Sequence, residues 1–142
     1  MIVLQDASAG TTSWDNLSNA TVVDNTYASS TMSGNTGDSA SSYYIKVLDW
    51  GFELPSNAVI LGVVVTIKHK ASGTGVRATE VKLVKGGTIQ ATNKGIDSAN
   101  IGTTDDTYDT YGAIDDLWSG TWTAGDINDE DFGVVVRYRN CL

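Results

Sequence analysis

The sequence predicts an all-β protein, an antiparallel β-sandwich with a jelly-roll-like topology. Residues 59–70 open with an unbroken run of Val, Ile, Leu and Gly and then alternate apolar with basic residues. This pattern indicates a long central strand, covered on both faces at its start and half-solvated at its end. Shorter β-branched and aromatic runs follow one another between turn-forming residues, and only one short segment carries a helix signal.

The N-terminal part of the chain, residues 1–42, is predicted to be polar and rich in loops. Short apolar clusters at 2–4, 22–23 and 27–28 interrupt its Ser, Thr, Asn and Gly residues, which predicts short strands joined by polar turns. The stretch 29–42 is nearly free of large apolar side chains. We therefore expect an exposed loop there.

Residues 43–50 show the alternation of a strand. Tyr44 and Leu48 fall on one of its faces, and Ile45 and Val47 fall on the other. The segment is therefore predicted to form a strand.

The long strand at 59–70 follows Pro55, which lacks an amide hydrogen and therefore marks the end or edge of the preceding strand. One face of the long strand is the better core face. It consists of Val59, Leu61, Val63, Val65, Ile67 and His69. Gly62, on the other face, allows a neighbouring backbone to approach closely or a bulge to form.

Two further strands are predicted over residues 76–85 and 132–139, each with alternate apolar side chains facing the core. These side chains are Val81 and Leu83 in the first strand, and Phe132, Val134, Val136 and Tyr138 in the second. Gly86 and Gly87 follow the first strand at once and predict a tight turn into residues 88–91, which completes a hairpin.

Between these strands, residues 92–107 predict a long polar connection. The aromatic residues of 108–122 predict two short strands around a turn. Thr123 and Asp126 have the spacing of a helix capping box, so residues 124–128 are predicted to form one helical turn.

Length and charge narrow the class of protein. The 142 residues are predicted to form one domain, 1–142, large enough to fold without a disulfide or a metal. The net charge is −8, and residues 97–131 hold ten acidic and no basic residues. A surface this negative argues against direct nucleic-acid binding. Residues 1–6 lack the pattern of a signal peptide and no apolar run could form a membrane span, so no membrane association is expected.

The sequence offers little catalytic chemistry, and we expect no enzymatic activity and no cofactor. The one histidine, His69, lies between two lysines in a predicted strand, and no nucleophile motif accompanies it. The single cysteine, Cys141, excludes an intrachain disulfide, and a zinc site would need more Cys and His ligands. The acidic residues of 97–131 offer oxygen ligands but not the spacing of a known calcium loop, so calcium binding stays open.

The chain has four tryptophans and two phenylalanines. The tryptophans are Trp14, Trp50, Trp118 and Trp122. Side chains of this size usually anchor a core or an interface. Trp118 and Trp122, which lie close together in the sequence, are also candidates for contact with a glycan or with a protein partner.

Several segments resemble, in their order and spacing, a family of small virion proteins of tailed bacteriophages. The resemblance covers residues 43–136. It rests on WGFELP at 50–55, AVILGVVV at 58–65, VKLVKGG at 81–87, YG at 111–112, DLWSGTWT at 116–123, DIN at 126–128 and FGV at 132–134. Position 119 is Ser where the pattern leads us to expect Gly. The resemblance implies a β-sandwich domain of a virion protein and does not separate head from tail.

We therefore expect a non-enzymatic capsid decoration or cement protein that stabilises the head lattice from the outer capsid surface of the virion. Its expected partners are the major capsid protein and further copies of itself, as a homotrimer. The first alternative is a tail or tail-fibre component that binds host surface glycans through exposed tryptophans, and the second is a glycan-active enzyme. Contact residues are expected in 1–12, in 29–42 and in the C-terminal 139–142.

Overall fold

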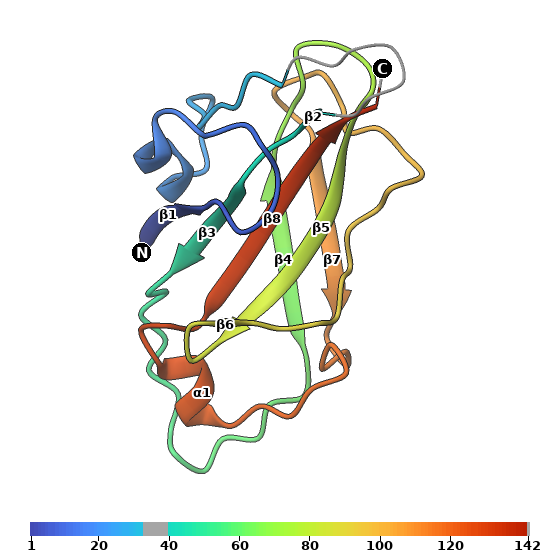
Figure 1. Cartoon of the computed structure of the whole chain (residues 1–142). Coiled ribbons are helices and arrows are strands. Elements are labelled where there is room, and N and C mark those ends of the chain that lie inside the picture. Colours follow the sequence, from blue (N-terminus) through green and yellow to red (C-terminus); the bar gives the residue numbers. More distant parts are fainter. Residues whose placement is uncertain (33–39, 142) are drawn as a thin grey trace.

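Two antiparallel β-sheets pack face to face and enclose the core (Figure 1). The computed structural model describes residues 1–32 and 40–141. Within these residues, six strands form the larger sheet in the order β1-β3-β8-β5-β6, with β2 paired to β8, while β4 and β7 form the smaller sheet. The strands are β1 (Ile2–Asp6), β2 (Ala40–Ser41), β3 (Tyr44–Leu48), β4 (Val63–Lys68), β5 (Val76–Lys85), β6 (Thr88–Ile89), β7 (Tyr108–Ala113) and β8 (Gly133–Asn140). The predicted antiparallel all-β fold is confirmed, and the jelly-roll topology stays a prediction.

The centre of the larger sheet is the pair β5 and β8. Its register places Leu83 opposite Val134 and Val81 opposite Val136. All four side chains are buried against the smaller sheet, from which Tyr111 of β7 closes the other side of the core. The predicted inward faces of these two strands are therefore confirmed.

The short-range signals of the second half of the chain are also confirmed. Gly86 and Gly87 have φ angles of 55° and 82°, the left-handed values that a two-residue hairpin turn requires. The helical turn α1 (Ala124–Asn128) begins with the predicted capping box. The Thr123 side-chain oxygen accepts from the Asp126 amide at 3.1 Å, and the Asp126 carboxylate accepts from the Thr123 amide at 2.9 Å.

The face of the larger sheet that points away from the core carries a second, smaller buried cluster. Its fully buried members are Tyr44, Leu48, Val84 and Val135. In the centre of this face, the Glu80 carboxylate accepts hydrogen bonds from Tyr44 Oη at 2.8 Å and from Arg137 at 2.7 Å, and pairs with Lys82 at 2.8 Å. The outer face is therefore held by one apolar cluster and one charged network.

The prediction of a long central strand at 59–70 is wrong in its length and its position. The strand β4 starts at Val63 and pairs only with β7, in the two-stranded sheet. Val59 and Leu61, predicted in the core, are 80% and 71% exposed. The reason is that the segment before Gly62 lies outside both sheets and makes only a single bridge, from Val59 to Thr123. From Val63 onward the predicted core face is correct.

Three smaller predictions are also wrong. The exposed loop expected over 29–42 does not reach its predicted end, because Ala40 and Ser41 form β2 and Ser41 and Ser42 are buried. The clusters at 22–23 and 27–28 form no strands; the 3-10 helix η1 (Leu17–Thr21) precedes them, and Val22 and Val23 are exposed. Of the two strands expected in 108–122, only β7 forms, because the residues after it build a turn instead. In the parts of the chain that the structure describes, no helix is long and apolar enough to cross a membrane.

Candidate functional site

Trp118 and Trp122, the predicted contact residues, lie in the core, with 3% and 9% of their surface exposed. Each indole N–H is used within the fold: that of Trp118 donates to the Val63 carbonyl at 2.8 Å, and that of Trp122 donates to the Leu117 carbonyl at 3.0 Å. Neither ring offers a free face on which a sugar could stack. The prediction of a contact surface at these two residues is therefore wrong for this structure, and their role is to close the end of the sandwich near α1.

Two exposed aromatic rings, those of Trp50 and Phe52, lie just after β3; Tyr108 of β7 is exposed elsewhere. The exposed fractions of Trp50 and Phe52 are 39% and 43%, and the two rings stack with centroids 6.5 Å apart. Phe52 also meets the edge of buried Phe132 at 6.2 Å, and Phe132 meets Trp122 at 5.5 Å. A ladder of four rings thus runs from the surface into the core, which fixes the exposed pair on a rigid base.

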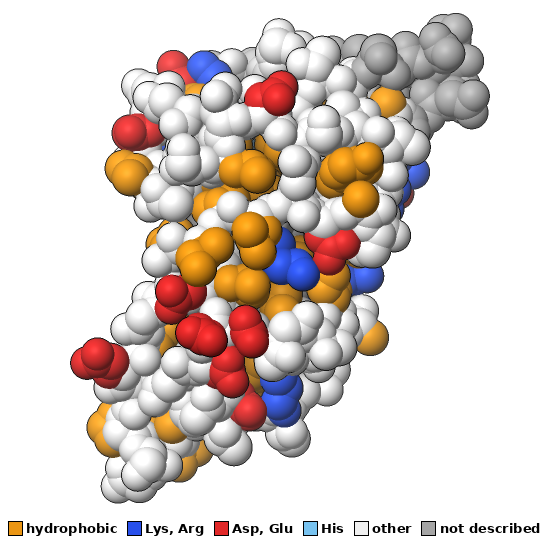
Figure 2. All heavy atoms as spheres, turned by 60° about the vertical axis from the view of Figure 1, so that its left-hand side comes forward, with side chains coloured by type: hydrophobic (Ala, Val, Ile, Leu, Met, Phe, Trp, Pro, Cys, Tyr) orange, Lys and Arg blue, Asp and Glu red, His pale blue; other side chains and the backbone are white. Residues whose placement is uncertain are grey.

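Exposed apolar side chains continue from this pair onto the edge strand β1. Ile2 pairs with Leu48, the last residue of β3, and therefore lies at the same corner of the sheet as Trp50. Ile2 and Leu4 are 50% and 47% exposed. We call Ile2, Leu4, Trp50 and Phe52 the edge surface. Figure 2 shows hydrophobic side chains gathered across the middle of this side of the molecule.

The strand β1 adds an unpaired backbone edge to this surface. It bonds to β3 on one side only, and no other described strand pairs with it. The 3-10 helix η1 packs against β1. The apolar side chains of β1 that stay exposed can still associate with another chain. The Asp6–Lys46 ion pair, with 3.1 Å between Nζ and Oδ2, holds the far end of β1 to β3. The edge surface is thus a fixed part of the sheet.

A groove of about 230 Å³ lies beside the edge surface. It is lined by apolar side chains of the 51–62 segment, the start of β4, and the residues around α1. These are Phe52, Leu54, Ile60, Val63, Val64, Ile127 and Phe132, together with Gly62. The Asn128 side chain fixes the outer wall, since its amide group donates to the Leu54 carbonyl at 2.9 Å and its oxygen accepts from the Leu54 amide at 2.8 Å.

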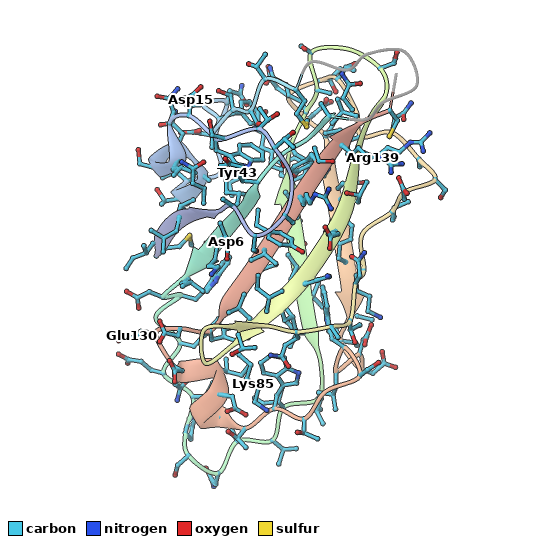
Figure 3. All side chains as sticks on the ribbon, in the orientation of Figure 1. Asp6, Asp15, Tyr43, Lys85, Glu130 and Arg139 are labelled. Atoms are coloured by element: carbon cyan, nitrogen blue, oxygen red, sulfur yellow. The ribbon has the colours of Figure 1, made fainter. Side chains whose placement is uncertain are left out.

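Four acidic residues are neighbours, in the sequence, of residues that line the groove. Glu53 stands between two lining residues, and Asp129, Glu130 and Asp131 connect Ile127 to Phe132. We call Glu53, Asp129, Glu130 and Asp131 the acidic rim. All four are exposed, and none forms an ion pair with a described Lys or Arg. In Figure 3 the labelled Glu130 lies at the margin of the molecule beside α1, and Figure 2 shows acidic side chains below the hydrophobic ones.

Two acidic residues, one between β7 and α1 and one within α1, are paired with lysines. Asp126 lies 3.6 Å from Lys85 Nζ, and Asp116 lies 2.6 Å from Lys94 Nζ. Backbone and side-chain hydrogen bonds from Thr123 lower the pKa of Asp126, with the nearby Lys85 adding to the effect. The four carboxylates of the rim, by contrast, have no such partner among the described residues.

The histidine His69 takes part in a buried hydrogen-bonded chain. Its Nε2 lies 2.6 Å from Asp109 of β7, and its Nδ1 lies 2.7 Å from the Tyr138 hydroxyl of β8. Because a carboxylate only accepts, Nε2 donates to Asp109, while Nδ1 and the Tyr138 hydroxyl share the second hydrogen bond. Burial raises the pKa of Tyr138, which keeps its hydroxyl protonated. These two hydrogen bonds link β7 of the smaller sheet to β8 of the larger sheet through His69. The Tyr138 side chain is buried in the core.

The other predicted ligand and contact residues are engaged within the fold. Among the described residues, no group of three or more His, Cys, Asp or Glu side chains has the arrangement of a metal site. In the predicted contact segment 139–142, Arg139 pairs with Asp97 at 2.7 Å, and half-buried Cys141 donates its amide to Gly75. Leu142 and residues 33–39 of the predicted 29–42 contact loop lie outside the described residues.

The predicted contact segment 1–12 divides into two parts. Its first half forms β1 and contributes the edge surface. Its second half is docked: the amides of Thr11 and Thr12 both donate to the Ser41 carbonyl. Gly10, at φ 81°, lies so close to the Ser42 backbone that a Cβ would collide with it.

No family model, no curated protein and no solved structure matches this chain.

Proposed function

We propose that this chain is a non-enzymatic structural protein of a bacteriophage virion, and that it acts as a capsid decoration protein on the outer surface of the head. The observation that carries the proposal is the edge surface. Its apolar side chains adjoin an unpaired strand edge, and large exposed apolar patches on proteins mark sites of association. In this proposal the edge surface contacts the major capsid protein, and copies of the chain assemble as a homotrimer.

The alternative of a tail component that binds host glycans receives less support. It depended on exposed tryptophans with free ring faces, and the two that the sequence singled out are buried. Trp50 is exposed, but its ring stacks on Phe52, which leaves one face at most for a ligand. The proposal of protein contact uses the same two rings as part of a larger apolar surface.

The test is binding of the purified protein to capsids that lack it, measured by co-sedimentation. The proposal expects saturation at a fixed number of copies per capsomer. The double variant Ile2→Ser with Leu4→Ser should bind about thirtyfold more weakly, because each half-exposed side chain contributes about 1 kcal/mol when it becomes buried. Ile96→Ser is the matched control, since Ile96 is also 47% exposed but lies beside β5, at the other side of the sheet.

Two results would contradict the proposal. One is unchanged capsid binding of the Ile2 and Leu4 double variant while its fold is intact. The other is electron-microscopic labelling of the protein only at the tail. Light scattering of the isolated protein at several concentrations tests the homotrimer separately, and a monomer at all concentrations would remove that part of the proposal.

A further inference from the structure

The size of the groove limits what can fill it. Its volume of about 230 Å³ falls below the roughly 300–1,000 Å³ of typical small-molecule sites. Its lining is apolar along the 51–62 segment, β4 and α1, and Phe132 at its base is 5% exposed. A groove of this size and lining suits one or two apolar side chains of another chain better than a whole small ligand.

The charges around the groove limit what can flank those side chains. The rim contributes four carboxylates that no described cation pairs with, and residues 97–131 contain no Lys or Arg at all. Lys85, which lies beside α1, is held by Asp126 and by the Thr121 carbonyl. An approaching acidic segment is repelled by this rim, whereas Lys or Arg side chains find its unpaired carboxylates next to the lining residues in the sequence.

We infer that the groove binds an apolar side chain of a partner protein segment that carries Lys or Arg on either side of it. The inference deepens the proposed function and rests on it for the identity of the partner, the capsid lattice. The groove supplies the anchor contact, and the rim supplies charge selectivity. Exposed Val64, at the mouth of the groove, and the neighbouring edge surface extend the apolar contact around the anchor.

The probe is a set of synthetic peptides with one central Leu or Phe. One series has Lys and Arg flanks, a second has Asp and Glu flanks, and a third has basic flanks around a central Ser. Binding is followed by NMR amide shifts of the full protein. The basic peptides with an apolar centre should shift residues 52–64 and 127–132, while the other two series should bind at least about tenfold more weakly.

Two variants separate the contributions of shape and charge. Val64→Phe fills the mouth of the groove from a side chain that is 45% exposed, and should abolish the shifts. The double variant Glu53→Gln with Glu130→Gln should weaken basic-peptide binding about fivefold and reduce its dependence on salt. Asp15→Asn with Asp24→Asn is the matched control, since both residues are exposed and lie in the N-terminal part of the chain.

The inference is overturned by equal binding of the acidic series, by shifts that map outside the groove, or by unchanged binding in Val64→Phe. Its failure is distinguishable from that of the proposed function. A protein that decorates capsids but binds no basic peptide retains the proposed function and loses the groove assignment. A protein that binds basic peptides in the groove but no capsid retains the groove assignment and loses the decoration function.

Discussion

Replacement of Glu80 by Gln should destabilise the fold strongly at neutral pH and hardly at all in acid. The Glu80 side chain, 16% exposed, receives Tyr44 Oη, Arg137 Nη1 and Lys82 Nζ at 2.7–2.8 Å. Burial by itself would raise its pKa. The hydrogen bonds from Arg137, Lys82 and Tyr44 together outweigh burial and lower the pKa from 4.5 to about 2.

The size of the effect follows from this shift. The change of the Glu80 pKa on folding corresponds to about 3 kcal/mol of stability, at about 1.36 kcal/mol per pKa unit. Since the folded-state pKa lies below the unfolded value of 4.5, this stabilisation is complete above that pH. It is lost as the pH falls through about 2, and near pH 2 less than about 1 kcal/mol remains.

The assay is urea unfolding of the wild type and Glu80→Gln at a series of pH values. The expected difference in unfolding free energy is about 3 kcal/mol at pH 7 and shrinks steadily below pH 4.5. Glu130→Gln is the isosteric control: its side chain is exposed and pairs with no described cation, so a change below about 0.5 kcal/mol is expected. A Glu80→Gln difference that is the same at pH 7 and pH 2.5 would refute the argument from charge.

Three further substitutions test the interior and the turns. Trp118→Ala should cost about 3–5 kcal/mol in urea unfolding, because the ring is buried; a loss below 1 kcal/mol would contradict its place in the core. Ser119→Gly should raise the midpoint of thermal unfolding by a gain of about 0.5–1 kcal/mol, since Ser119 adopts φ 56° and glycine is unstrained there; a lower midpoint would argue against the strain. Tyr138→Phe should cost about 1–3 kcal/mol, because buried His69 Nδ1 loses its hydrogen-bond partner, and a stability equal to the wild type would show that the hydroxyl is dispensable.

The strands that sequence reasoning predicted well are those whose side chains alternate within one buried sheet. The predicted strand over 76–85 has the bounds of β5, and the final strand differs from β8 by one residue at each end. The two-glycine turn and the capping box were equally readable, since both depend only on local backbone geometry. The pairing of β5 with β8 was not readable, because it joins segments far apart in the sequence.

The candidate site was harder to predict than the fold. Val59 and Leu61 have the composition of a buried strand, and composition alone cannot reveal that the segment leaves the sheets before Val63. Trp118 and Trp122 were chosen by residue type, yet their indole N–H groups are satisfied by carbonyls inside the fold. Phe52 carried a usable signal for an exposed ring. It lies between Gly51 and Pro55, outside any strand, so its side chain has no sheet face to pack on.

Some of the exposed apolar residues gather on one side of the molecule, and this grouping supports that side as a contact region. Single exposed apolar side chains are ordinary on soluble proteins and need no explanation. Here, however, Ile2, Trp50 and Phe52 lie at one corner, next to an unpaired strand edge and an apolar groove. The rim charges stand beside this region without cations of their own. In the proposed interface, the apolar surface supplies binding energy and the acidic rim favours basic partners. Capsid binding and basic-peptide binding must therefore be measured on the same variants.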